Sequence, residues 1–211
     1  INDDGDNILH ITCENGNLDI AKYLISLEKI DLSVKNDDNE TVFHKACHSG
    51  NHELVKYLLQ VGKFDINALS KYRRTPMYHA IYSEKLPLVK YLSSLKDINL
   101  KVKDDEGKTF LHQAADLSEP EAITTYLMGL KKIPLNAKDD DQKTVLHYAC
   151  TSGRSAFIKK LTKKKELNIT DTDSSGKNIL HIACDCNKTD ISLIQYLISL
   201  NKIDINSKDK E

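Results

Sequence analysis

This 211-residue chain contains no tryptophan and carries almost no net charge. Thirty Lys and Arg residues oppose 31 Asp and Glu residues, which leaves a formal charge of −1. Such a balance provides no overall field that would draw the chain toward phosphate backbones or anionic membranes. We therefore expect neither nucleic acid nor a membrane among its partners.

Long apolar runs are also missing. The longest mostly apolar stretches, such as residues 196–200, fall far below the ~18 residues that suggest a membrane span, and the first residues lack the pattern of a signal peptide. Hydrophobic residues make up 40% of the chain and charged residues 29%, which is typical of a folded protein with a well-solvated surface. We expect a cytoplasmic protein, and a nuclear one fits the same composition.

Cysteine is scarce and odd in number, with Cys13, Cys47, Cys150, Cys184 and Cys186. The first four occupy equivalent places in a repeated pattern, on what we expect to be buried helix faces. Because disulfide frameworks join distant loops, this arrangement favours reduced thiols and an intracellular compartment.

The chain does contain a repeated tetrapeptide: Thr or Asn, any residue, a hydrophobic residue, then His. The copies are Asn7–His10, Thr41–His44, Thr109–His112, Thr144–His147 and Asn178–His181, with Thr75–Tyr78 in the remaining slot. Their fourth positions are 34, 34, 34, 35 and 34 residues apart. A constant period of this length indicates a solenoid, in which each unit buries its apolar face against its neighbours. We predict a single array over residues 1–211, with approximate units 5–37, 38–71, 72–104, 105–139, 140–173 and 174–207.

The second unit shows how one repeat should fold. Thr41 is a good helix cap, and the helix that follows should stop near Gly50, which can adopt a left-handed conformation. Residues 54–59 have the apolar spacing of a second helix. The alternating segment 64–68 and turn-forming clusters such as 36–39 predict a short hairpin before each helix pair.

These residues resemble the ankyrin-repeat family, whose units carry a Thr-Pro-Leu-His-x-Ala signature, a helix-ending glycine and an Asp-Val-Asn-Ala-like segment. The resemblance covers essentially the whole chain in six successive near-matches. Tetratricopeptide arrays have a similar period, but their tryptophan-centred pattern has no counterpart here. The expected fold is therefore an all-α solenoid of helix-turn-helix units joined by short β-hairpin loops. Extra residues near Glu119–Pro120 and 187–189 should make those two turns between helices bulge.

Histidine and cysteine recur three residues apart on one helix face, and both are zinc ligands. The pairs are His10/Cys13, His44/Cys47, His147/Cys150 and His181/Cys184. Each unit supplies only two ligands, however, and neighbouring helices stack roughly 8–10 Å apart, too far to share an ion held at ~2.0–2.3 Å. By resemblance to the family, each imidazole should bond within the hairpin and cap region. We expect no metal, no cofactor and no catalytic residue, so the chain should not be an enzyme.

The run Lys159–Lys165 is the densest basic segment. It could form a nuclear-import or anionic-lipid patch. The alternative, which we favour at this stage, is a solvated outer face of the second helix in the fifth unit.

The family resemblance implies that partners bind a concave face built from hairpin tips and exposed positions of the first helix. The third tip is basic and aromatic whereas other tips are acidic, and Tyr and Arg are enriched at binding hot spots. We hypothesise that an acidic or mixed-charge protein segment binds there, with a contact set of Lys71, Tyr72, Arg73, Arg74, His79 and Tyr82. The alternative is a solvated loop whose arginines pair with neighbouring acidic tips.

The expected function is that of a protein–protein interaction scaffold, monomeric and of eukaryotic source. The alternative is a regulatory or targeting segment of a larger enzyme or channel. Because the sequence starts at Ile1 and its last helix includes Ile198 and Leu200, we expect further repeats to flank it.

Overall fold

The computed structural model describes residues 1–62 and 64–210, and in these residues it contains twelve α-helices and no β-strand. The chain divides into two compact parts, residues 1–105 and 106–211. The N-terminal part contains α1 (Ile8–Glu14), α2 (Leu18–Ser26), α3 (Val42–Ser49), α4 (His52–Val61), α5 (Pro76–Tyr82) and α6 (Leu86–Ser93). The C-terminal part contains α7 (Phe110–Asp116), α8 (Pro120–Met128), α9 (Val145–Thr151), α10 (Ser155–Thr162), α11 (Ile179–Asp185) and α12 (Ile191–Ser199). The all-helical fold class is as predicted, whereas the prediction of one continuous array stays a prediction.

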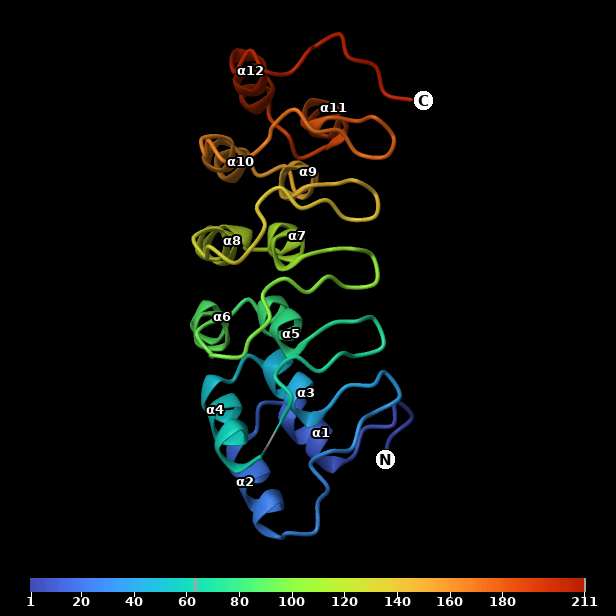
Figure 1. Ribbon diagram of the computed structural model, residues 1–211, viewed down its shortest axis with the longest axis vertical. Helices are drawn as coiled ribbons and strands as arrows, with labels where there is room; N and C mark the ends of the chain where they lie inside the picture. Colours follow the sequence, from blue (N-terminus) through green and yellow to red (C-terminus); the bar gives the residue numbers. More distant parts are fainter. Residues whose placement is uncertain (63, 211) are drawn as a thin grey trace. The chain divides into compact units, whose positions relative to one another are not determined.

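Helices alternate between two rows within each part (Figure 1). The odd-numbered helices, here called the inner helices, form one row, and loops extend from them on the side away from the even-numbered, outer helices. The far ends of these loops are called tips below. None of the helices in the described residues has the length and apolar character needed to cross a bilayer.

The predicted cap at Thr41 is confirmed, and the inner helices in the described residues all begin at caps in the same slot of the repeat. The caps are Asn7, Thr41, Thr75, Thr109, Thr144 and Asn178, each with extended backbone angles. The predicted stop at Gly50 is also confirmed, because this residue ends α3 with a φ of 72°. Only glycine adopts that conformation without steric strain.

Apolar side chains fill the space between neighbouring helices. Leu9 on α1 and Phe43 on α3 are fully buried, and small Ala46 lets the inner helices approach closely. On the outer row, Leu54 and Leu58 of α4 are equally buried. Each such large side chain contributes roughly 1.5–3 kcal/mol of burial free energy, so the repeated apolar positions hold the helix pairs together.

The predicted short hairpin loops are present, closed by backbone hydrogen bonds such as Asn36 N to Glu40 O at 3.0 Å. Among the described residues only isolated bridges are found, Lys35 with Thr41 and Thr172 with Asn178. The alternating segment before the third tip is a turn because Asp65 Oδ1 accepts a hydrogen bond from the Asn67 amide at 2.9 Å. Asn67 Nδ2 then donates to the Asp97 carbonyl at 2.8 Å, which joins successive loops without a strand ladder.

Backbone hydrogen bonds link neighbouring tips within each part. In the N-terminal part, Lys71 N donates to Asp38 O at 2.7 Å and Asp105 N donates to Tyr72 O at 3.3 Å. In the C-terminal part, Asp140 N donates to Glu106 O at 3.1 Å. The tips therefore form a fixed row in which side chains of adjacent repeats lie side by side.

Of the two predicted bulges between helices, one is confirmed and one is wrong. The connection between α11 and α12, residues 186–190, is longer than the connection between α1 and α2, residues 15–17. Residues 117–119 separate α7 from α8, which is as short a connection as the one between α1 and α2. The predicted bulge is therefore not found at this turn.

Candidate functional site

The repeated histidine has a structural role, because it joins the start of its own helix to the next loop through hydrogen bonds; it is called the histidine strut below. In the second repeat, His44 Nδ1 accepts the Thr41 amide at 3.1 Å and lies 2.9 Å from Thr41 Oγ1. Since Nδ1 accepts, Nε2 carries the proton and donates to the Ala68 carbonyl at 3.0 Å. Burial lowers the pKa of His44, so the ring is neutral near pH 7. Both nitrogens are thus engaged in joining the helix start to the next loop.

The same bonds recur around His10, His112 and His181. Residues 1–62 and 64–210 contain no group of three or more His, Cys, Asp or Glu side chains arranged to hold a metal ion. The bonding of the imidazoles, expected from the family resemblance, is confirmed for these histidines. His147 keeps the bond from the Thr144 amide at 3.1 Å, whereas its Nε2 has no hydrogen-bond partner in the described residues.

The cysteines are unpaired thiols, and not all of them are buried. Cys13, Cys47 and Cys150 are buried, and burial raises the pKa of Cys13 and of Cys150 to about 12. The expectation of a buried Cys184 is wrong, because no helix in the described residues covers this face of α11, and the thiol is exposed.

The third repeat departs from the strut pattern. Tyr78 replaces the histidine, and it is 2% exposed. Burial and then the nearby Asp104 carboxylate raise the pKa of its hydroxyl. Without a ring nitrogen beside it, the buried Thr75 Oγ1 has no hydrogen-bond partner in the described structure. This repeat therefore gives up the local stabilisation that a Thr–His pair supplies elsewhere.

The third tip, Lys71–Arg74, holds an aromatic ring between two cations. The Tyr72 ring centroid lies 5.8 Å from Lys71 Nζ and 5.4 Å from Arg74 Cζ. Lys71 Nζ is also 3.4 Å from Asp38 Oδ1, and Arg74 Nε is 3.9 Å from Asp104 Oδ2. Pairing with acidic groups of neighbouring tips, the alternative reading of this loop, thus holds for Lys71 and Arg74.

Arg73 differs from both flanking cations. Its side chain is exposed and makes no ion pair, hydrogen bond or ring contact within the described residues. Its φ is 56°, a left-handed value that Gly107 and Gly176 adopt at the equivalent place in other tips. An arginine there is strained by about 1 kcal/mol or more relative to glycine. The guanidinium of Arg73 is therefore both exposed and free of intramolecular pairing in the described residues.

Tyr82 and His79 lie on α5 but differ in accessibility. Tyr82 is 63% exposed and stacks on the His48 ring of α3, with the centroids 5.4 Å apart. His79 is only 14% exposed, packed edge-on against His44 at 5.4 Å. His79, a member of the hypothesised contact set, is thus largely covered by the rings of α3.

Burial dominates the electrostatics of His79. Burial, with smaller contributions from the neighbouring His44, His48, Arg74 and Lys45, lowers the pKa of His79 to about 3. Nε2 lies 3.2 Å from Glu40 Oε1 but is not aligned for a hydrogen bond. Because desolvation outweighs this one carboxylate, we assign a neutral ring at neutral pH.

The inner surface of the N-terminal part also holds a charged network that the sequence reading missed. Lys45 Nζ lies 3.3 Å from Glu14 Oε1, 3.3 Å from Glu40 Oε2 and 3.5 Å from Asp6 Oδ2. Lys45 and His48 occupy the places on α3 that His79 and Tyr82 occupy on α5. An alignment of these two positions across all the repeats would have identified the side chains that line the inner helices.

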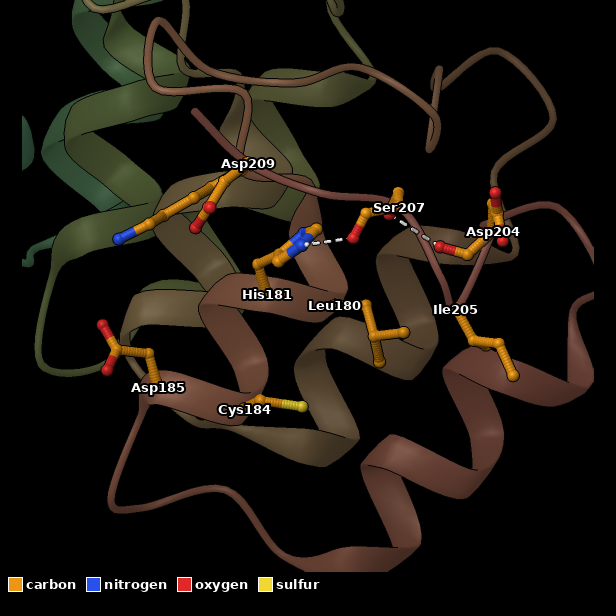
Figure 2. Close-up of a pocket in the computed structure, with 9 residues that line it drawn as sticks. Leu180, His181, Cys184, Asp185, Asp204, Ile205, Ser207 and Asp209 are labelled. Atoms are coloured by element: carbon orange, nitrogen blue, oxygen red, sulfur yellow. Dashed lines mark hydrogen bonds between the residues drawn. The ribbon is translucent and has the colours of Figure 1, made fainter. Parts of the chain in front are cut away.

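A pocket of about 420 Å³ lies beside α11 (Figure 2). Leu180 and Cys184 line it, together with His181, whose Nε2 bonds the Ser207 carbonyl at 3.0 Å. The equivalent residues of the preceding repeat, Leu146 and Cys150, are buried. The pocket is thus the stacking face of the last described repeat, and its histidine is already engaged.

Comparisons with known proteins agree with this geometry. The family model described as Ankyrin repeats (3 copies) matches residues 9–104, 63–139, 85–171 and 111–209. No curated protein sequence matches the chain. The human ASB11 ankyrin repeat domain is similar in structure, with a TM-score of 0.82 and 19% identity, over 97% of this chain and 87% of that one.

A second similar structure is a chain from the complex of the Bd0816 predatory endopeptidase of Bdellovibrio bacteriovorus with the immunity protein Bd3460. Its TM-score is 0.75 at 23% identity, over 92% of this chain and 98% of that one. At these identities the likeness concerns the fold alone.

Proposed function

Because this chain belongs to the ankyrin-repeat family, we propose that it is a non-catalytic scaffold that binds a partner protein along its tips and inner helices. Repeats of this family generally serve as protein–protein interaction modules. One similar chain comes from a complex of two proteins, which supports the same reading.

The main support for this proposal comes from the side chains of the third tip. Tyr72 is 44% exposed, and the two cations beside its ring restrict its motion. Ordering this side chain on binding then costs little conformational entropy, which favours a hot spot. Arg73 supplies a free guanidinium, which binds carboxylates through two parallel hydrogen bonds.

Tyr82 extends the proposed surface across the inner row. It lies at the far end of α5 from the tip, and seven helical residues span roughly 10 Å. Its exposed ring, stacked on His48, offers an apolar contact beside the negatively charged groups around Lys45. A partner segment with a carboxylate for Arg73 and an apolar or basic side chain farther along fits these charges.

His79 takes a supporting part in this proposal. Its buried ring packs against His44 and lies 6.0 Å from His48, so it helps to orient the ring on which Tyr82 stacks. It is a positioning residue rather than a contact.

The test replaces the accessible residues together, as Tyr72→Ala, Arg73→Ala and Tyr82→Ala. Arg74 stays in place because Asp104, which it approaches, is buried. Partners captured by the native chain should lose at least tenfold in affinity. The matched control is Lys22→Ala with Tyr23→Ala on outer helix α2, where Tyr23 is 65% exposed. Equal affinity of the native and triple-variant chains would refute the proposal.

A further inference from the structure

Free lysines gather along one edge of the C-terminal part. They follow the ends of its three outer helices: Lys131 and Lys132 after α8, Lys163, Lys164 and Lys165 after α10, and Lys202 after α12. All six are exposed. In the stretches that the structure describes, none of their ammonium groups takes part in an ion pair, hydrogen bond or ring contact. These six residues are called the lysine edge.

Contacts between the loops hold the lysine edge together. Asn136 Nδ2 donates to the Glu166 carbonyl at 2.7 Å and Asn136 Oδ1 accepts the Asn168 amide at 2.8 Å, which ties the first loop to the second. Thr162 Oγ1 lies 2.9 Å from the Tyr196 hydroxyl, which joins the end of α10 to α12. Packed helices lie roughly 8–10 Å apart, so the loops that carry the lysines follow one another at about this spacing.

The charge of this edge is local and unbalanced. Within the loops 129–135, 163–169 and 200–206, the six lysines face only Glu166 and Asp204 as acidic residues, a net charge of +4. The corresponding loops 27–33 and 95–101 of the N-terminal part balance when taken together, with Glu28 and Asp31 against Lys29 and with Asp97 against Lys96 and Lys101. The near-neutral total charge of the chain therefore conceals a basic edge.

Complementing helix dipoles does not account for this excess. A cation at a helix C-terminus contributes about 0.3–1 kcal/mol, and the effect fades within one turn, so one lysine per helix is enough. Three consecutive lysines follow α10. By contrast, Lys159 and Lys160 on the helix itself are engaged, with Ser192 and Glu121 respectively.

A folded turn does not suit the nuclear-import reading of this run. Leu161 and Leu167 are buried at 2% and 7% exposure and fix both ends of the lysine turn. The Lys164 amide donates to Leu161 O at 2.9 Å, and Leu167 N donates to Lys164 O at 3.1 Å. A receptor that binds an extended basic peptide would have to unfold this turn.

The neighbouring side chains favour lipid over nucleic acid. Of the large hydrophobic side chains exposed in residues 106–210, none is aromatic, so bases have no ring on which to stack. Lysine ammonium groups bind the phosphates and carboxylates of anionic lipids without any aromatic platform.

We propose that the lysine edge is a peripheral contact site for an anionic membrane surface, recognised through lipid phosphate and carboxylate headgroups. The proposal departs from the expectation, drawn from the low net charge, that the chain has no membrane partner. The site is separate from the tips and inner helices, so it does not depend on the proposed protein-binding function.

The test is sedimentation of the full chain with phosphatidylcholine vesicles that do or do not contain phosphatidylserine, at low and high salt. We expect binding only to the vesicles with phosphatidylserine, and weaker binding as salt screens the lysines. The variant Lys163→Gln, Lys164→Gln, Lys165→Gln should bind on the order of a hundredfold more weakly.

The matched control, Lys29→Gln, Lys96→Gln, Lys101→Gln, removes the same charge from the N-terminal part and should bind like the native chain. Circular dichroism melts check that both variants are folded. Absence of binding at low salt, equal losses in the two variants, or tighter binding to a duplex DNA probe than to the anionic vesicles would each overturn the proposal.

Discussion

The buried ring of His79 should make the N-terminal part sensitive to mild acid. The pKa of this histidine is about 3 in the folded chain, against 6.5 for an ordinary histidine. Above pH 6.5 the ring is neutral in both the folded and the unfolded states. As pH falls below 6.5, the unfolded chain binds a proton that the folded chain excludes, so stability is lost progressively down to about pH 3.

The size of the effect follows from these two values. At pH 5, His79 alone should lower the free energy of unfolding by about 2 kcal/mol relative to neutral pH. The variant His79→Gln removes the titrating group and places there the residue found as Gln113 in the next repeat. Losses due to other histidines with lowered pKa, such as His10 and His44, occur in both proteins and cancel in the comparison.

Urea denaturation of the native chain and of His79→Gln at neutral pH and at pH 5 measures this difference. We expect the native chain to lose about 2 kcal/mol more than the variant. If the two chains lose equally, or if the native chain loses less, then Glu40 holds a charged imidazolium at 3.2 Å and the argument from burial is refuted.

Three further predictions concern a turn, a strut and a thiol. Arg73→Gly should stabilise the chain by about 1 kcal/mol in thermal melts, because the left-handed φ of 56° suits glycine. The same variant should bind the partner more weakly, and Arg73→Asn, whose side chain also tolerates this conformation, should lose the same affinity. His112→Ala should lower the free energy of unfolding in urea by about 2–4 kcal/mol, since it removes the hydrogen bonds of 2.9 Å to the Thr109 amide and 3.0 Å to Ala137 O. A change below about 0.5 kcal/mol would show that the histidine strut is dispensable. Maleimide should label Cys184 in the native state but Cys13, Cys47 and Cys150 only after unfolding, as mass spectrometry would show.

Features set by neighbouring residues in the sequence could be predicted well. A cap such as Thr41 and a stop such as Gly50 depend on local backbone geometry, which residue type reveals directly. The histidine strut needed the family resemblance, because its second bond reaches Ala68, 24 residues away. The short hairpin loops were predicted, but alternation of apolar and polar residues did not reveal that segment 64–68 is a turn held by Asp65.

The candidate site was predictable only in part, because accessibility depends on neighbouring repeats. Tyr72 and Tyr82 are exposed as expected, whereas His79 is covered by rings from α3. The strained backbone of Arg73 follows from the alignment of its tip with Gly107 and Gly176. Half of the lysine edge, Lys163–Lys165, lies in the basic run that the sequence shows directly. Lys131, Lys132 and Lys202 are scattered through the sequence and join that run only when the outer helices pack.

Site-specific photo-crosslinking in extracts of the source cells tests the central claim, partner binding on the tips and inner helices, most directly. A photoreactive phenylalanine analogue would replace Tyr72, Tyr82 or, as an outer-helix control, Tyr23, with mass spectrometry identifying the adducts. We predict that positions 72 and 82 crosslink to a common partner protein and that position 23 does not. A partner captured from position 23 alone would contradict the account.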